Sequence, residues 1–156
     1  MLLVNDRADI ARLAGADGVH VGQDDLDPAA ARRVVGDDAI VGRSTHTLAQ
    51  IASAAREPVD YIAVGPVFAT ASKTTGYEAV GLELVRQAVR YGKPIVAIGG
   101  ISEASAAEVI GAGAASVAVI GELLRTGNPR ERVRALLEAV VPARKARRPD
   151  FDDLGR

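Results

Sequence analysis

The chain has 156 residues, of which 48% are hydrophobic and 25% are charged, a balance typical of a single folded domain. Its 19 basic and 20 acidic residues nearly cancel, so the sequence offers no overall positive field to attract nucleic acid. Cysteine is absent, which excludes a disulfide framework, a thiolate nucleophile and cysteine-ligated zinc. Any metal would need oxygen ligands or the two histidines, and a hard cation such as Mg²⁺ fits best.

The longest apolar runs are far shorter than the roughly 20 residues needed to cross a bilayer. The apolar stretch at the N-terminus is too brief for a signal peptide, and an acidic residue follows it closely. We therefore expect a cytoplasmic protein that has no membrane partner.

Six short runs of consecutive apolar residues predict strands, because such runs suit a parallel sheet covered on both faces. The segments between them leave room for a helix and two loops, which indicates a repeated strand–helix unit. Helix starts are marked by Asp27 and Asn128, each before a proline, and by Ser102. The predicted strands are residues 2–4, 19–21, 39–41, 61–64, 94–98 and 117–120.

The C-terminal residues differ in composition from the rest of the chain. The last amphipathic helix is expected over about residues 130–141. Residues 142–156 are highly charged with little to bury, so we expect a disordered tail outside a domain of residues 1–141.

Polar residues and glycines follow the predicted strands. In parallel strand–helix architectures these positions share one edge of the sheet, where functional groups collect. The segments are Asn5-Asp6, Gly22-Gln23-Asp24-Asp25, Arg43-Ser44-Thr45-His46, the long loop 65–76, Gly99-Gly100 and Gly121-Glu122.

Carboxylates follow the first two predicted strands, which are neighbours. Asp6 and the pair Asp24-Asp25 could together hold one Mg²⁺ ion that also binds substrate phosphate oxygens. The alternative is that these aspartates only cap the helices that follow.

Glycine turns follow the last two predicted strands. Gly99-Gly100 and Ile120-Gly121 each open a helix, so their backbone N–H groups could bind a phosphate. The position matches the phosphate site that TIM barrels often build after their final strands. Tight turns also need glycine without any ligand, which is the alternative explanation.

Three further side chains are candidates for function. Lys73 lies in a loop rich in threonine and serine that could bind a pyrophosphate, although a solvated surface is the alternative. His20 lies inside an apolar run and is expected to be a packed, hydrogen-bonded core residue, whereas His46 at a strand end is the better functional candidate. Neither histidine has an obvious partner, and no nucleophile–base–orienter triad is evident.

The strand-end motifs, in their order, resemble those of the thiamine phosphate synthase family. The resemblance runs from Leu2 to about Val141. The motifs that carry it are Leu3-Val4-Asn5-Asp6-Arg7, Gly18-Val19-His20-Val21-Gly22-Gln23-Asp24-Asp25-Leu26, Gly42-Arg43-Ser44-Thr45-His46, Val64-Gly65-Pro66-Val67-Phe68-Ala69-Thr70 with Ser72-Lys73, and Ala97-Ile98-Gly99-Gly100-Ile101.

The resemblance implies a TIM (β/α)8-barrel transferase assisted by Mg²⁺. The enzyme would join 4-amino-2-methyl-5-pyrimidinylmethyl diphosphate to thiazole phosphate and release pyrophosphate, and the diphosphate would leave before the thiazole nitrogen attacks. Asp6 and Asp25 would bind the metal, and Ser44 and Lys73 would be catalytic. The pyrophosphate or the pyrimidine would be contacted by Asn5, Ser44, Thr70, Ser72 and Lys73, and the thiazole phosphate by the backbone of Gly100, Ile120 and Gly121.

The chain departs from the family pattern in two ways. Gly121 stands where serine is common, which removes a hydroxyl but keeps the backbone donor. The family also has two earlier βα units, one with a Gln-x-Arg-x-Lys strand whose cations hold the pyrophosphate, so six of eight units are expected here. We therefore expect an incomplete barrel, low turnover, and open sheet edges that favour a homo-oligomer.

Two other functions remain as alternatives. One is a non-catalytic module that binds phosphate or a partner and has lost the synthase activity. The other is a thiazole tautomerase-like isomerase of the same fold, against which Asn5-Asp6 with Asp25 argues, because that isomerisation needs no metal–pyrophosphate chemistry.

Overall fold

The computed structural model of the chain describes residues 1–70 and 76–147. Its centre is one sheet of six parallel strands, hydrogen-bonded in the order β1-β2-β3-β4-β5-β6. Each strand therefore pairs with its neighbours in sequence. The strands are β1 (Leu3–Asn5), β2 (Gly18–Val21), β3 (Ile40–Thr45), β4 (Tyr61–Val64), β5 (Ile95–Ile98) and β6 (Ser116–Ala118).

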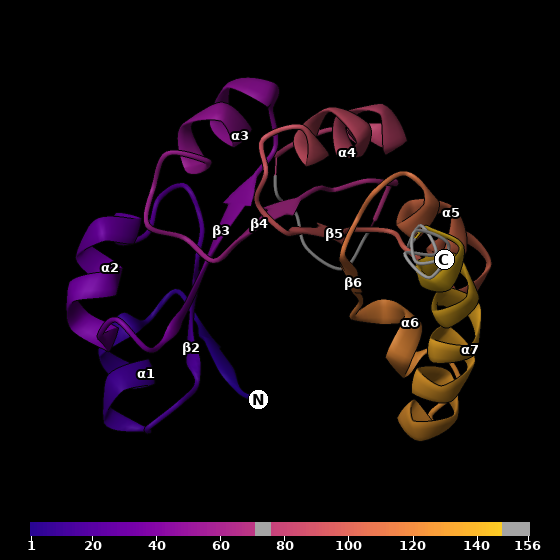
Figure 1. Ribbon diagram of the computed structural model, residues 1–156. Helices are drawn as coiled ribbons and strands as arrows, with labels where there is room; N and C mark the ends of the chain where they lie inside the picture. Colours follow the sequence, from indigo (N-terminus) through magenta and orange to yellow (C-terminus); the bar gives the residue numbers. More distant parts are fainter. Residues whose placement is uncertain (71–75, 148–156) are drawn as a thin grey trace, which may run out of the picture.

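Helices connect successive strands and lie on one face of the sheet. Figure 1 shows the sheet curled into an arc with the helices around its outer side, an arrangement that forms part of a TIM barrel. The helices are α1 (Ala8–Leu13), α2 (Pro28–Val35), α3 (Leu48–Ala54), α4 (Gly81–Val89), α5 (Glu103–Gly111), α6 (Gly121–Leu124) and α7 (Pro129–Arg147). Among the described residues, no helix combines the length and the apolar character that a bilayer span requires.

The helix starts follow the capping signals in the sequence. Asp27 Oδ1 accepts the backbone N–H of Ala29 at 2.9 Å at the start of α2. Asn128 Oδ1 accepts the backbone N–H of Glu131 at 3.3 Å at the start of α7. Ser102 immediately precedes α5, and its N–H donates to a hydroxyl in the first turn. All three predicted starts are confirmed.

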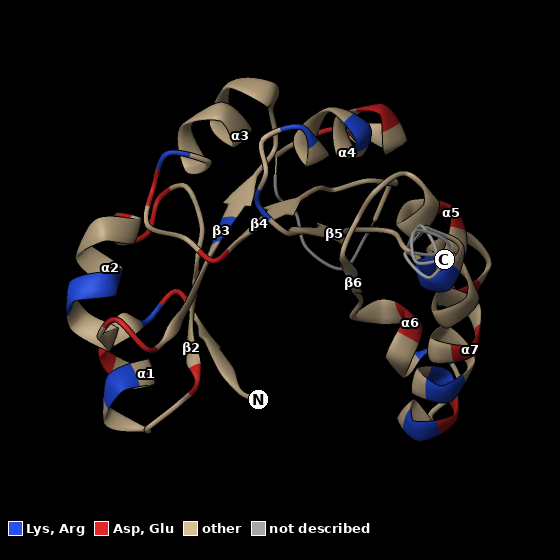
Figure 2. Cartoon of the chain, viewed as in Figure 1, with Lys and Arg blue, Asp and Glu red and all other residues tan. Residues whose placement is uncertain are grey.

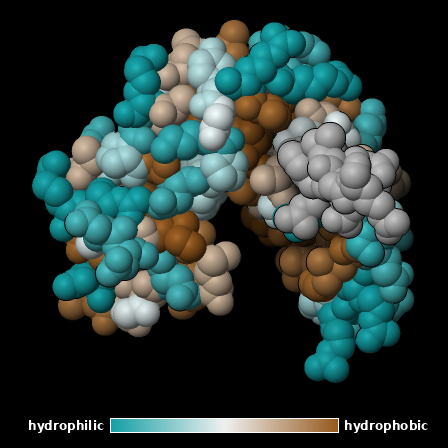
Figure 3. Space-filling view, in the orientation of Figure 1, coloured by the Kyte–Doolittle hydropathy of each residue, from teal (hydrophilic) through white to brown (hydrophobic). Residues whose placement is uncertain are grey.

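The hydrophobic core lies between the sheet and its outer helices. Val19, Val21 and Val41 are fully buried there, whereas Val96 and Ile98 on the inner face are only half-buried. The expectation that both faces are covered is therefore wrong for this arc. An open arc leaves its inner side chains without the opposing strands that fill a closed barrel, and Figure 3 shows hydrophobic residues gathered around the hollow.

The last helix extends beyond its predicted end near residue 141. Helix α7 runs past Pro142 to Arg147, where the sequence suggested the start of a tail. Leu136 and Val140 pack into the core, and half-buried Ala143 extends the same contact by one turn. The next residues are good helix formers, so this packing continues the helix. Residues 148–156 lie outside the described part of the chain.

We expect the isolated 156-residue polypeptide to self-associate. The strands β1 and β6 are the edges of its sheet, and Leu124, Leu137 and Ile120 are more than half exposed. Unpaired edges and apolar surface both favour association between copies. Sedimentation velocity should show species larger than the 16.2 kDa monomer. A single monomeric boundary at all concentrations would contradict this expectation.

Candidate active site

The strand-end residues lie at one edge of the sheet, because all six strands run parallel. Asn5, Asp6, Asp25 and Ser44 come from three neighbouring strands, β1, β2 and β3, or the turns directly after them. Gly100, Ile120 and Gly121 follow the neighbouring strands β5 and β6. Thr70 belongs to the loop after β4, between these two groups, and Ser72 and Lys73 lie outside the described residues.

Asp6 occupies a strained backbone position directly after β1. Its φ of 65° lies in the left-handed region, which non-glycine residues rarely adopt. Its N–H donates to the carbonyl of His20 at 2.7 Å, and the side-chain amide of Asn5 donates to Asp6 Oδ1 at 2.7 Å. Helix α1 begins two residues later without a side-chain cap, so Asp6 is not its capping residue. Strain of this kind concentrates at functional sites.

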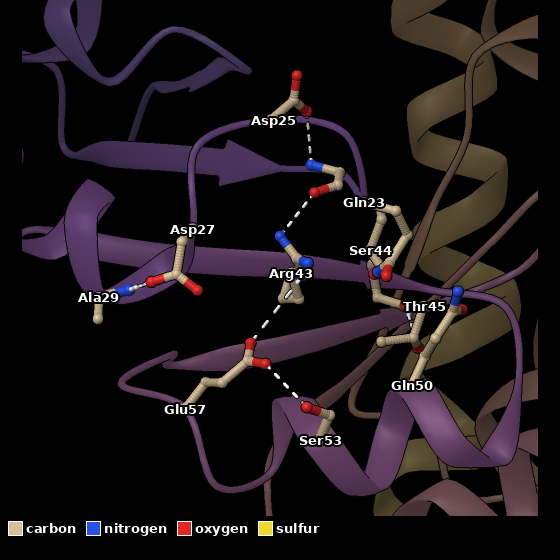
Figure 4. Close-up of polar contacts among 12 residues, drawn as sticks. Gln23, Asp25, Asp27, Ala29, Arg43, Ser44, Thr45, Gln50, Ser53 and Glu57 are labelled. Carbon is tan, nitrogen blue, oxygen red and sulfur yellow. Dashed lines mark hydrogen bonds and ion pairs between the residues drawn. The ribbon is translucent and has the colours of Figure 1, made fainter.

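Asp25 is held in a compact turn after β2. Its Oδ2 accepts the N–H of Gly22 at 2.7 Å, and Arg43 Nη1 donates to the Gly22 carbonyl at 2.6 Å. Arg43 Nε lies 4.0 Å from Glu57 Oε2, in the turn after α3. The guanidinium therefore bridges the turn after β2 and the turn after α3 (Figure 4). Helix α2 is capped by Asp27, so Asp25 is not its capping residue.

Ser44 lies in β3 at the centre of a hydrogen-bonded group. Its Oγ is 2.8 Å from His20 Nε2, and His20 Nδ1 is 2.8 Å from the Tyr61 hydroxyl. Gln23 Nε2 donates to the Ser44 carbonyl at 2.5 Å. Burial raises the pKa of Tyr61 above its ordinary value. The expectation that His20 is hydrogen-bonded is confirmed, but it is half-buried on the inner face rather than part of the core.

His46 also has partners, contrary to the expectation from sequence. Its Nδ1 is 2.6 Å from the carbonyl of Gly65, and its ring stacks on Tyr77 with centroids 3.8 Å apart. Its backbone N–H donates to Gln50 Oε1 at 2.7 Å. These contacts join β3, α3 and the loop after β4, so His46 helps to hold that loop.

The loop after β4 packs tightly on the glycine turn after β5. Val67 and Phe68 donate their N–H groups to the carbonyls of Ile98 and Gly99 at 2.9 and 3.0 Å. A Cβ on Gly100 would lie 2.5 Å from the Ala69 carbonyl oxygen, and its φ is 65°. Loop packing alone therefore requires glycine at this position. This agrees with the alternative that the turn needs glycine whether or not it binds a phosphate.

An ion-pair cluster around the buried Arg132 joins the starts of α5 and α6 to α7. Arg132, only 7% exposed, donates to Glu103 Oε2 at 2.8 Å and also to Glu122. The hydrogen bond to Glu122 is the main reason why the pKa of Arg132 lies above its ordinary value. Figure 2 shows acidic residues on α5 and α6 and basic residues on the adjacent α7. Because Glu122 follows Gly121 directly, the cluster fixes that turn.

Sequence reasoning missed the roles of Arg43, Tyr61 and Arg132. Arg43 stood inside a recognised motif, but its partners are a carbonyl and a carboxylate distant in sequence. Tyr61 and Arg132 gave no signal, because a strand tyrosine and a helix arginine are ordinary residues.

Comparison with known proteins places the chain in one family. Residues 1–123 match the family model described as thiamine monophosphate synthase. Thiamine-phosphate synthase of Koribacter versatilis is 53% identical over 139 residues, covering 88% of this chain and 64% of that protein. The enzyme of the same name from Mycobacterium sp. strain KMS is 48% identical over 143 residues, covering 90% and 63%. The chain thus spans less than two thirds of these relatives.

Comparison with solved structures supports the same family and fold. Thiamine phosphate pyrophosphorylase from Pyrococcus furiosus superposes with a TM-score of 0.82 at 32% identity, covering 90% of this chain and 67% of that one. Orotidine 5'-phosphate decarboxylase from Pyrococcus horikoshii, at 18% identity and a TM-score of 0.63, shares the fold alone. With the motifs at one edge of a parallel half-barrel, these matches lead to one conclusion: the chain belongs to the thiamine monophosphate synthase family.

Proposed function

We propose that this chain contributes the active-site edge of a thiamine-phosphate synthase. The reaction breaks the bond between the methylene carbon and the diphosphate oxygen of the pyrimidine substrate. It then forms a bond from that carbon to the thiazole nitrogen of thiazole phosphate, with pyrophosphate as the second product. The observation that carries the proposal is the order of the family motifs on successive strands, all at one edge of the sheet.

The pyrimidine diphosphate would bind along the ends of β1 to β4. Asn5 and Ser44 offer an amide and a hydroxyl there, and Thr70 offers a second hydroxyl from the loop after β4. Ser72 and Lys73 are proposed as further contacts on the sequence motif alone, with Lys73 supplying a positive charge for the departing diphosphate. This chemistry needs fixed charges more than a general base.

Asp6 and Asp25 fit a Mg²⁺ ion by their chemistry. They are carboxylates at the ends of neighbouring strands, and the Asn5 amide orients the Asp6 side chain by donating to its Oδ1 at 2.7 Å. Among residues 1–70 and 76–147, no three acidic or histidine side chains gather as a self-sufficient metal site. Mg²⁺ is commonly bound by one or two carboxylates together with substrate phosphates. When bound, the ion would neutralise charge on the diphosphate.

The thiazole phosphate would bind at the other end of the arc. The backbone N–H groups of Gly100, Ile120 and Gly121 are the proposed donors, in turns that the loop after β4 and the Arg132 cluster hold in place. Glycine at position 121 keeps the backbone donor that this role requires.

The test is Asp25→Asn with isothermal titration calorimetry. We expect Mg²⁺-dependent pyrophosphate affinity to fall by about 10–100-fold, as when a metal site loses a supporting group, because the substitution removes one carboxylate charge. Thiazole phosphate affinity should stay within about twofold of wild type, since its proposed donors are backbone groups elsewhere on the arc.

Asp24→Asn is the matched control. Asp24 is the neighbouring exposed aspartate, and its loss should leave both affinities unchanged. Equal weakening of both ligands by Asp25→Asn would contradict the metal assignment. A wild-type chain that binds thiazole phosphate but no pyrophosphate would favour the non-catalytic module instead.

A further inference from the structure

A chain of hydrogen bonds crosses three strands on the inner face of the arc. The Tyr61 hydroxyl lies 2.8 Å from His20 Nδ1, and His20 Nε2 lies 2.8 Å from Ser44 Oγ. Tyr61 belongs to β4, His20 to β2 and Ser44 to β3. Both ring nitrogens of His20 are therefore engaged, one by a phenol and one by an alcohol.

Gly42 makes this contact possible. In the sheet register, Gly42 pairs with His20 on one side and with Tyr61 on the other. A Cβ on Gly42 would lie 2.1 Å from Tyr61 Cζ, so any other residue would push the phenol away. The two rings instead stack across β3, with centroids 5.6 Å apart and an interplanar angle of 20°.

The direction of the hydrogen bonds follows from the chemistry of the three groups. Neutral imidazole carries one N–H, so one ring nitrogen donates and the other accepts. A phenol is a more acidic hydrogen-bond donor than an aliphatic alcohol, and a tyrosine hydroxyl carries its proton at neutral pH. This difference favours the tautomer in which Tyr61 donates to Nδ1, the imidazole proton resides on Nε2, and Nε2–H donates to Ser44 Oγ.

The opposite arrangement would give Ser44 a different role. If the proton were on Nδ1, the Ser44 hydroxyl would donate to Nε2 and present only lone pairs to a ligand. With the proton on Nε2, the hydroxyl hydrogen of Ser44 stays available for an external acceptor. The phenol thus determines whether Ser44 is a donor or an acceptor.

We propose that Tyr61 and His20 are positioning residues that hold the Ser44 hydroxyl as a hydrogen-bond donor for an acceptor atom of the pyrimidine diphosphate. The inference rests on the proposed function and adds a specificity determinant to it. The acceptor is either a ring nitrogen or a diphosphate oxygen, and both lack a proton to donate. The relay does not turn Ser44 into a nucleophile, because a neutral phenol supplies no negative charge to stabilise an imidazolium.

The orientation is tested first without ligand. The chain has two histidines, and a His46→Gln variant assigns their ¹⁵N side-chain signals. We expect His20 to show a protonated Nε2 and an unprotonated Nδ1 in the wild-type protein, and Tyr61→Phe to move the proton toward Nδ1. A wild-type His20 protonated mainly on Nδ1 would overturn the proposal, whatever the behaviour of the variants.

The effect on binding is tested by calorimetry with pyrimidine diphosphate and Mg²⁺. Tyr61→Phe should weaken affinity by about 5–10-fold, the value of one lost hydrogen bond, and Ser44→Ala by a similar factor. The double variant should be no weaker than Ser44→Ala, because both changes remove the same donor. Tyr91→Phe, at a tyrosine on the far side of the sheet at the end of α4, should bind like wild type. Additive losses, or no loss in Tyr61→Phe, would refute the relay.

Pyrophosphate alone identifies the acceptor. If Tyr61→Phe weakens pyrophosphate equally, Ser44 donates to the diphosphate, and if pyrophosphate binding is unchanged, Ser44 donates to the pyrimidine; both results support the relay. Failure of the wild-type chain to bind pyrimidine diphosphate would refute the proposed function and the substrate role of Ser44 with it. The ¹⁵N spectrum would still decide the orientation of the relay separately.

Discussion

Gly65→Ala should lower the free energy of unfolding by about 2–4 kcal/mol, near the upper end of what overpacking costs. A Cβ at this buried position would lie 2.2 Å from the Ile98 carbonyl oxygen and 2.8 Å from Ile98 Cγ2. The obstacle is backbone of the adjacent strand β5, so rotation of a side chain cannot relieve the contact. The same carbonyl accepts the Val67 N–H, and its displacement should release the loop after β4. Urea unfolding followed by circular dichroism gives the measurement.

Gly111→Ala is the matched control for that substitution. Gly111 ends α5, its φ is not in the left-handed region, and, apart from its chain neighbours and the backbone of its own helix, no atom of the described residues lies within 4 Å of the position of its Cβ. Alanine should leave stability unchanged or raise it by up to about 1 kcal/mol, through helix propensity. If both variants unfold at the same urea concentration as wild type, the close approach of β4 and β5 does not limit stability.

Arg43→Met should destabilise the protein by about 2–3 kcal/mol and weaken Mg²⁺-dependent pyrophosphate binding about tenfold. Methionine keeps most of the aliphatic stem but removes the donor to the Gly22 carbonyl. It also leaves Glu57, whose side chain is 24% exposed, without the cation that faces it. The turn that holds Asp25 through the Gly22 N–H would then be free to move. Urea unfolding and calorimetry measure the two effects.

Arg56→Met controls for the loss of one positive charge in the same region. Arg56 is exposed and directly precedes Glu57 in sequence, so its removal should change stability by less than about 0.5 kcal/mol. Pyrophosphate affinity should also be unchanged. Equal effects of the two substitutions would show that net charge, and not the bridge to Gly22, is what matters.

The architecture was predictable from the sequence because it depends on local patterns. Short apolar runs that alternate with capped helical segments indicate a repeated strand–helix unit. Asp27, Ser102 and Asn128 start their helices through contacts within three residues, so their roles are visible in the sequence. The positions of Asp6, Asp25 and Ser44 at one edge follow as well, because parallel strands place their carboxyl ends together. The family motifs then indicated the reaction that we propose.

The partners of these residues were decided by the tertiary structure alone. Gly42 leaves room for the Tyr61 ring to reach His20 only because these two residues lie on either side of it in register. Arg43 supports the Asp25 turn only because β2 and β3 are adjacent, and Arg132 reaches Glu103 and Glu122 only after α7 folds back on α5. Helix α7 likewise extends past residue 141 because its contact with the core continues through Ala143. Hydrogen bonds across strands depend on register and on which helix covers which strand, and neither is encoded in the neighbouring residues of the chain.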